Sequence, residues 1–173
     1  VQTSGTGRIE IAGTGGGNSG AAATSGSHGV QITGANSRVV SGSGDISIQG
    51  VGGGITTGNN SGNHGVLVNS TDARIESAGG NISIDGTGGG GLAGDDSSDR
   101  GVYVVGAGAR ITTTGAGSIN VAGTGGGGGG GNDDTNTGVE VSGTEARIAA
   151  QDGNVTLNGM GGAGRSGNVG VTG

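Results

Sequence analysis

The stretch GVLVNSTDARIESAGGNISIDGTGGGG, residues 65–91, contains three short segments in which apolar residues alternate with polar ones. These are GVLV at 65–68, ARIE at 73–76 and NISI at 81–84, and a glycine tract follows the third. A period of two is typical of β-strands, because successive side chains of a strand point to opposite faces. The stretch therefore predicts three strands joined by short turns, with a glycine-rich connection after them.

The same arrangement recurs along the whole chain. Gly-Val pairs begin at residues 29, 65, 101 and 138, in steps of 36 or 37 residues, and again at residue 170. The NISI-type segment gives a second series, also in steps of 36 or 37: Ile9, Ile46, Ile82, Ile119 and Val155. The ARIE-type segment gives a third, with which Val1 aligns: Val39, Ile75, Ile111 and Ile148. A fixed period of this length indicates a repeat architecture.

A unit of three short strands cannot bury its apolar side alone, whereas copies stacked in register can. We therefore predict an all-β fold, a parallel β-helix (β-solenoid) in which each unit forms one coil. The single array would consist of coils at about 1–37, 38–73, 74–109, 110–146 and 147–173. A β-sandwich or an up-and-down barrel is the alternative, since evenly spaced strands can also be joined as hairpins.

The alternation also predicts which side chains face the core. The inward residues of the quoted stretch would be Val66, Val68, Ala73, Ile75, Ile82 and Ile84. The outward residues would be Leu67, Arg74, Glu76 and Ser83.

The glycine-rich connections at 13–28, 50–64, 86–100 and 123–137 are all 15 or 16 residues long, although their contents differ. Loose loops would be expected to vary in length, because lengthening a loop costs little free energy. We therefore expect successive connections to stack backbone to backbone. Glycine suits such stacking because it permits close approach and positive φ.

Composition excludes several classes of protein. The chain of 173 residues has 50 glycines and no proline, cysteine, tryptophan or phenylalanine. Collagen is excluded, since it requires glycine at every third position together with abundant proline. The net charge of −6, without a basic run or stacking aromatic residues, argues against a nucleic-acid partner. No apolar run approaches the roughly 20 residues of a membrane span, so membrane insertion is not expected.

Four arginines occupy one position of successive coils: Arg38, Arg74, Arg110 and Arg147. They could bind anionic glycans or an acidic neighbour. The favoured interpretation is a surface ladder relieved by the acids two residues earlier, Asp72 for Arg74 and Glu145 for Arg147, in exposed pairs that each stabilise the fold by under about 1 kcal/mol.

Two other groups of residues suggest metal binding. His28 and His64 share a position with Arg100, but no third ligand is evident, so we expect no metal there. Carboxylates in the glycine-rich connections are a better candidate for calcium, which favours oxygen ligands on loops. They are Asp95, Asp96, Asp99, Asp133 and Asp134. Their spacing matches no known calcium loop, and solvated loop tips are the favoured interpretation.

Catalytic residues are not evident. Paired carboxylates on one face cleave polysaccharides in some β-helices, but Asp45, Asp85 and Asp152 do not fall in one coil. An ice-binding face would need a regular threonine array, and Thr112, Thr113 and Thr114 occur in a single unit. We therefore expect no enzyme activity and no catalytic, cofactor or metal site.

The units GVYVVGAGARITTTGAGSINVAGTGGGG, residues 101–128, and GVLVNSTDARIESAGGNISIDGTGGGG resemble the glycine-rich repeats of very large bacterial surface exoproteins. Filamentous haemagglutinin and autotransporter-type adhesins are of this kind. The resemblance covers nearly all of the chain and implies a right-handed β-helix, export to the cell surface or medium, and roles in adhesion, aggregation or fibre building. Coils of that family are usually shorter, lack these glycine runs, and accompany a secretion domain that this sequence does not contain. The resemblance assigns no functional residue.

The sequence thus predicts a structural repeat segment of an extracellular filament or surface fibre, stacked coil on coil. Its partners would be further coils, reached by head-to-tail self-association or by covalent continuation, since the chain begins at Val1 and has no capping element. One alternative is an adhesin module that displays residues 86–100 and 123–137 to a receptor or glycan. A more remote one is a polysaccharide-active enzyme.

Overall fold

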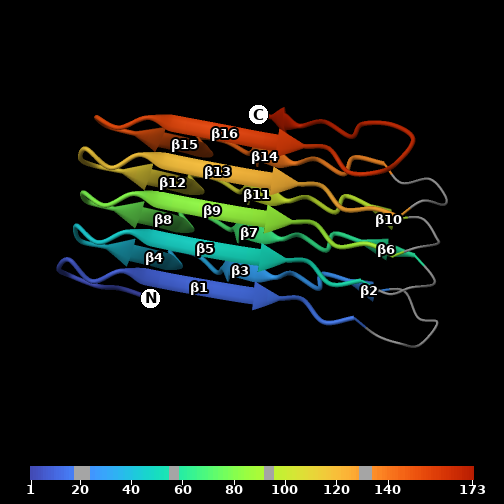
Figure 1. Cartoon of the computed structure of the whole chain (residues 1–173), viewed down its shortest axis with the longest axis horizontal. Coiled ribbons are helices and arrows are strands. Elements are labelled where there is room, and N and C mark those ends of the chain that lie inside the picture. Colours follow the sequence, from blue (N-terminus) through green and yellow to red (C-terminus); the bar gives the residue numbers. More distant parts are fainter. Residues whose placement is uncertain (18–23, 55–58, 92–95, 129–133) are drawn as a thin grey trace.

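The fold was analysed in a computed structural model, which describes residues 1–17, 24–54, 59–91, 96–128 and 134–173. These residues form strands and turns without any helix, and the strands stack as a parallel β-solenoid (Figure 1). The N-terminal strand lies at one end of the stack and the C-terminal coil at the other. The predicted fold is confirmed, and the hairpin-based alternatives are wrong because the paired strands run parallel.

Sheet 1 is built from the NISI-type segments. Its strands, in spatial order, are β1 (Ile9–Thr14), β5 (Ile46–Val51), β9 (Ile82–Thr87), β13 (Ile119–Thr124) and β16 (Val155–Met160). Equivalent residues pair without any shift in register. Register is fixed because a slip of one residue would turn the apolar side chains of a strand to the outside.

Two further sheets complete the coil. Sheet 2 contains the Gly-Val segments: β3 (Val30–Thr33), β7 (Val66–Asn69), β11 (Val102–Val105), β14 (Val139–Ser142) and β17 (Val171–Thr172). Sheet 3 contains β4 (Arg38–Ser41), β8 (Arg74–Ser77), β12 (Arg110–Thr113) and β15 (Arg147–Ala150). Gln2 adds an isolated bridge to Val40, so Val1 aligns with Val39 as the sequence indicated.

The core is a set of aliphatic ladders running along the stack. Val66, Val68, Ala73, Ile75, Ile82 and Ile84 are all buried in it, as predicted. Leu67 points away from this core, as predicted, yet its side chain is only 4 % exposed. It lies in register between Gln31 and Tyr103, whose longer side chains flank it.

The glycine-rich connections leave the solenoid as a thin slab of two backbone layers. The outgoing layer continues sheet 1, and the return layer leads back into sheet 2. A Cβ on Gly88 would collide with the carbonyl oxygen of Asp99 in the facing layer, and one on Gly52 with that of Asn63. The layers are therefore in direct backbone contact, which only glycine permits.

Hydrogen bonds also tie each outgoing layer to the return layer of the coil before it. The backbone N–H of Gly89 donates to the carbonyl oxygen of Asn63 at 2.6 Å, and that of Gly126 donates to Asp99 at 2.6 Å. The predicted stacking of the connections is thus confirmed for the described residues. The sequence did not predict the short strands of the return layer: β2 (Thr24–Ser25), β6 (Asn60–Ser61) and β10 (Asp96–Ser97).

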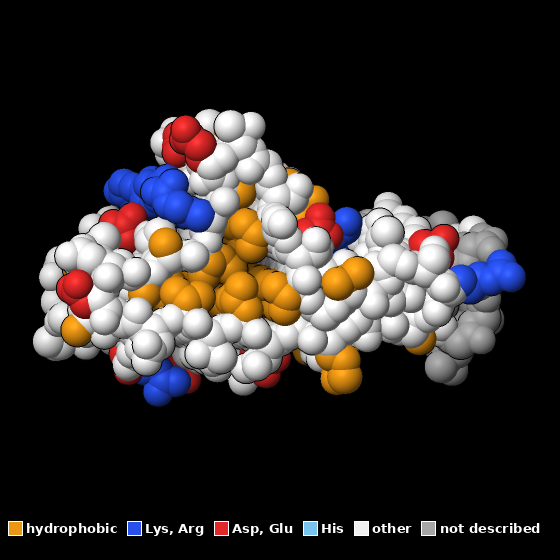
Figure 2. Space-filling model, turned by 90° about the horizontal axis from the view of Figure 1, so that it is seen from above, with side chains coloured by type: hydrophobic (Ala, Val, Ile, Leu, Met, Phe, Trp, Pro, Cys, Tyr) orange, Lys and Arg blue, Asp and Glu red, His pale blue; other side chains and the backbone are white. Residues whose placement is uncertain are grey.

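The C-terminal end of the stack exposes apolar side chains. Figure 2 looks onto this end and shows hydrophobic side chains uncovered at its centre. Ile119 is 1 % exposed, whereas Val155, its in-register partner in the last coil, is 41 % exposed. The apolar side chains of the last coil are therefore only partly covered, whereas Ile9, in the first strand of the same ladder, is 4 % exposed.

Candidate functional site

The four arginines at the start of the sheet 3 strands form a ladder, hereafter the arginine ladder. The parallel register places them side by side: Arg38, Arg74, Arg110 and Arg147. Adjacent strands are about 4.8 Å apart, so like charges are stacked closely along the outer face of the sheet. Figure 2 shows arginine side chains gathered in a recess of the molecular outline.

Two arginines of this ladder form ion pairs with carboxylates, but the partners differ from those predicted. Arg74 forms an ion pair with Glu76 of its own strand, with Nε and Oε2 3.4 Å apart. Asp72 reaches the following coil, where its Oδ1 lies 3.2 Å from Nη1 of Arg110. The predicted pairing of Asp72 with Arg74 is therefore wrong, because the turn that carries Asp72 aims its side chain along the stack.

Arg147 differs from both. Its Nη1 donates to the carbonyl oxygen of Glu145 at 3.5 Å, and the ion pairs found among the described residues do not include it. The predicted ion pair between Glu145 and Arg147 does not occur among the described residues. A shallow groove of about 290 Å³ lies beside Arg147 on the outer face of sheet 3.

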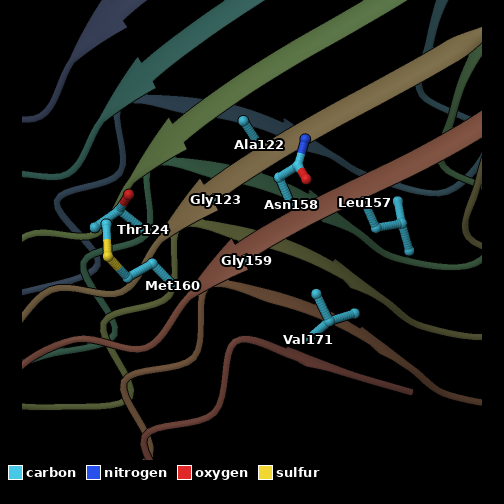
Figure 3. Close-up of a pocket in the computed structure, with 8 residues that line it drawn as sticks. All are labelled: Ala122, Gly123, Thr124, Leu157, Asn158, Gly159, Met160 and Val171. Carbon is cyan, nitrogen blue, oxygen red and sulfur yellow. The ribbon is translucent and has the colours of Figure 1, made fainter.

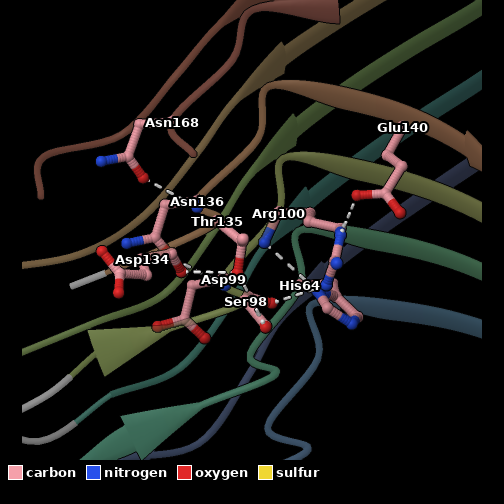
Figure 4. Close-up of polar contacts among 9 residues, drawn as sticks. All are labelled: His64, Ser98, Asp99, Arg100, Asp134, Thr135, Asn136, Glu140 and Asn168. Carbon is pink, nitrogen blue, oxygen red and sulfur yellow. Dashed lines mark hydrogen bonds and ion pairs between the residues drawn. The ribbon is translucent and has the colours of Figure 1, made fainter. Parts of the chain in front are cut away.

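The histidine column stands where the return layer meets sheet 2. The rings of His28 and His64 stack with centroids 5.0 Å apart and planes 9° from parallel. Tyr103 packs against His64 edge to face, and the Arg100 guanidinium lies 4.3 Å from the Tyr103 ring centroid. Arg100 also forms an ion pair with Glu140 (Figure 4).

Each histidine accepts a backbone hydrogen bond from the coil after it. The N–H of His64 donates to Nδ1 of His28, and the N–H of Arg100 donates to Nδ1 of His64, both at 3.2 Å. A neutral ring that accepts at Nδ1 carries its proton on Nε2, so neither nitrogen offers a lone pair to a metal while these bonds persist. Burial, with the nearby charges of His28 and Arg100, lowers the pKa of His64 to about 3, and burial also lowers the pKa of His28.

Sequence reasoning missed a second ladder beside the histidines, hereafter the asparagine ladder. In it, Asn or Asp side chains accept backbone hydrogen bonds from the preceding coil. The backbone N–H of Ser27 donates to Asn63 Oδ1, that of Asn63 to Asp99, that of Asp99 to Asn136, and that of Asn136 to Asn168, at 2.6–2.8 Å. Figure 4 shows the upper part of this ladder. Every member lies two residues before the glycine of a Gly-Val pair, and that recurrence of Ser, Asn or Asp is the signal that would have revealed it.

The acidic residues proposed for calcium do not converge on a metal site in the described structure. Asp95 and Asp133 lie outside the described residues. The others each accept a backbone N–H: Asp96 from Gly91, Asp99 from Asn63 and Asp134 from Ser166. No group of three or more potential ligands occurs among the residues that the structure describes.

The carboxylates weighed for catalysis are also dispersed. Asp45 accepts the backbone N–H of Asn81 at 2.7 Å, so its carboxylate joins two successive coils. Asp85 lies at an outward position of β9, and Asp152 lies in the turn after β15. The three residues belong to different coils, as the sequence indicated.

A further groove, of about 450 Å³, lies at the C-terminal end of sheet 1. Figure 3 shows Met160, Leu157 and Val171 along its border, with backbone of Gly123 and Gly159 between them. It contains no ionisable side chain. Its composition suits apolar packing better than chemistry.

Comparison with known proteins adds no relative. No family model, no curated protein and no solved structure matches the chain. The described part of the chain contains no helix with the length and hydropathy to cross a membrane. Its parallel, in-register sheets define it as a β-solenoid repeat protein.

Proposed function

We propose that this chain is a structural repeat segment of an extracellular filament or surface fibre. The observation that carries the proposal is the uncovered apolar end of the C-terminal coil. Within one ladder, Ile119 between two coils is 1 % exposed and Val155, with a coil on one side, is 41 % exposed. A further coil, supplied by the same chain or by another copy, would cover this end of the stack.

The hydrogen bonds between coils support the same proposal. Backbone ladders, the arginine-to-carboxylate contact between coils and the asparagine ladder all join one coil to the next. In such one-dimensional arrays, stability grows with each added interface between repeats. Because the register is maintained from coil to coil, a further coil would meet the same complementary surface.

The proposed location outside the cell rests on the resemblance of the repeats to those of bacterial surface exoproteins. The proposed role is non-catalytic, and the dispersed carboxylates support it. The partner would be a further coil of the same kind.

Electron microscopy of native material, together with the mass of the intact chain, tests this proposal. We expect unbranched fibres of constant width, or a chain whose solenoid is longer than 173 residues. Val155→Asp should shorten or abolish assembly of the isolated segment, because it places a carboxylate where the next coil would stack. Thr156→Asp, which alters the neighbouring outward position, is the control. A native chain of this length that is monomeric at high concentration would contradict the proposal.

An adhesin module is the second candidate. It is favoured by the glycine-rich slab, which projects from one side of the solenoid (Figure 1). The segments proposed for display, 86–100 and 123–137, are partly outside the described residues. Microscopy also separates the two roles, because isolated stalks on cells would favour the adhesin and long uniform fibres the filament.

A further inference from the structure

We propose that the groove beside Arg147 on the outer face of sheet 3 binds the carboxylate or sulfate group of an acidic polysaccharide. This inference goes beyond the fibre role and does not depend on it. It rests on a comparison of Arg147 with Arg74 and Arg110, which precede it in the same ladder.

Arg74 and Arg110 each have a carboxylate partner, in two different ways. Glu76 lies two residues after Arg74 on the same strand, and their side chains pair. Asp72 lies in the turn of the coil before Arg110, and that pair crosses between coils. Both sources of a carboxylate can therefore be located for any member of the ladder.

Both sources are missing for Arg147. The residue in register with Glu76 on its own strand is Ala149. The residue of the preceding coil that is equivalent to Asp72 is Gly108, which has the same left-handed backbone, with φ of 71° against 57°. Arg147 is exposed on the outer face and retains only its contact with the carbonyl oxygen of Glu145.

The groove lies over Ala149, where a larger side chain such as that of Glu76 would project. Its lining comes from three successive strands, so it extends along the stacking axis. Arg110 and Arg147 contribute positive charge, while Thr112, Thr114 and Gln151 contribute hydroxyl and amide groups. Glu76 lies in the part of the groove contributed by β8. Its negative charge would repel an anionic group from that part and favour a position near Arg147.

The chemistry of the lining identifies the ligand class. A guanidinium group binds a carboxylate or sulfate through two parallel hydrogen bonds, and such charge-assisted bonds are among the strongest available at a surface. Hydroxyl and amide side chains along the groove suit the hydroxyl groups of sugars. The lining contains no aromatic residue on which a nucleic-acid base would stack. A linear polymer is favoured because the groove crosses several strands.

Binding of polygalacturonate and of heparin to the chain, measured by calorimetry against neutral dextran, tests this assignment. We expect binding of one of the anionic polymers and none of dextran. Arg147→Gln should weaken it roughly ten- to hundredfold, which corresponds to the loss of one charged hydrogen-bonded contact.

Ala149→Glu gives a sharper test, because it recreates beside Arg147 the carboxylate that Glu76 provides to Arg74. We expect it to weaken binding as strongly as Arg147→Gln does. Ser83→Glu adds the same charge at an exposed outward position of sheet 1 and should leave binding unchanged. Circular dichroism confirms that each variant is folded. Wild-type affinity in Ala149→Glu, failure of both anionic polymers to bind, equal binding of dextran, or tighter binding of a DNA oligonucleotide would each overturn the proposal.

Discussion

The imidazole of His64 lies parallel to that of His28, 5.0 Å away, and its backbone N–H donates to the Nδ1 atom of His28. The His28 ring thus stacks against the His64 ring and also accepts a hydrogen bond from the His64 backbone N–H. This bond is not part of the backbone-to-backbone ladder. Acceptance of this hydrogen bond requires the neutral form of the ring, since a protonated Nδ1 cannot accept. The junction between the slab and the solenoid is therefore sensitive to acid.

Acidification should destabilise the fold through His64. Its pKa is about 3 in the folded chain and near 6.5 when unfolded, so between these values the unfolded state binds more protons. The stabilisation is complete above pH 6.5 and is lost progressively as pH falls towards 3, by a few kcal/mol in total. Urea unfolding followed from pH 7.5 to pH 3.5 measures it. His64→Asn keeps an acceptor atom near the Nδ1 position and should flatten this part of the profile; an unchanged profile would assign the acid sensitivity to other groups.

Glycines in the slab should differ sharply in their tolerance of alanine. Gly88→Ala places a Cβ against the carbonyl oxygen of Asp99 and should lower the free energy of unfolding by about 1–3 kcal/mol or more. Gly16→Ala, in a slab segment where a Cβ meets nothing within 4 Å, should have little effect. Thermal unfolding of the two variants provides the comparison. Equal stability would show that the layers are not in contact in solution.

The asparagine ladder should be energetically significant. Asn136→Ala removes the acceptor of the Asp99 N–H and the donor to the carbonyl oxygen of Asp96, in a fully buried environment. We expect a loss of about 1–3 kcal/mol, the usual cost of leaving a buried polar group without its partner. Asn158→Ala, at an exposed outward position of β16, is the matched control. Similar losses in both variants would contradict a specific role for the ladder.

Core substitutions should depend on position along the stack. Ile84→Ala, with coils on both sides, should cost about 2–5 kcal/mol, because the cavity cannot be filled from either direction. Leu157→Ala removes an aliphatic side chain from the same ladder in the last coil and should cost markedly less. Denaturant unfolding of both variants measures the difference. In an assembled fibre that difference should disappear, which links this measurement to the proposed function.

Much of the fold could be predicted from periodicity. The alternation in residues 65–91 identified the core residues Val66, Ile75 and Ile84, and the 36–37-residue repeat gave the parallel stack. Constant length of the glycine-rich connections predicted their stacking. The outward direction of Leu67 was also predicted, but its burial was not, since alternation gives the direction of a side chain and not the size of the neighbours that cover it.

The sequence by itself determined the repeat and the inward faces of its strands, because strand period and coil period are both local properties of the chain. Only the tertiary structure decided which side chains meet between coils. Asp72 forms an ion pair with Arg110, His28 accepts a hydrogen bond from the backbone N–H of His64, and Arg147 has no carboxylate partner of either kind found for Arg74 and Arg110. These contacts join residues about one coil apart. Their partners depend on how each turn directs its side chain along the stack, which the repeat period does not specify.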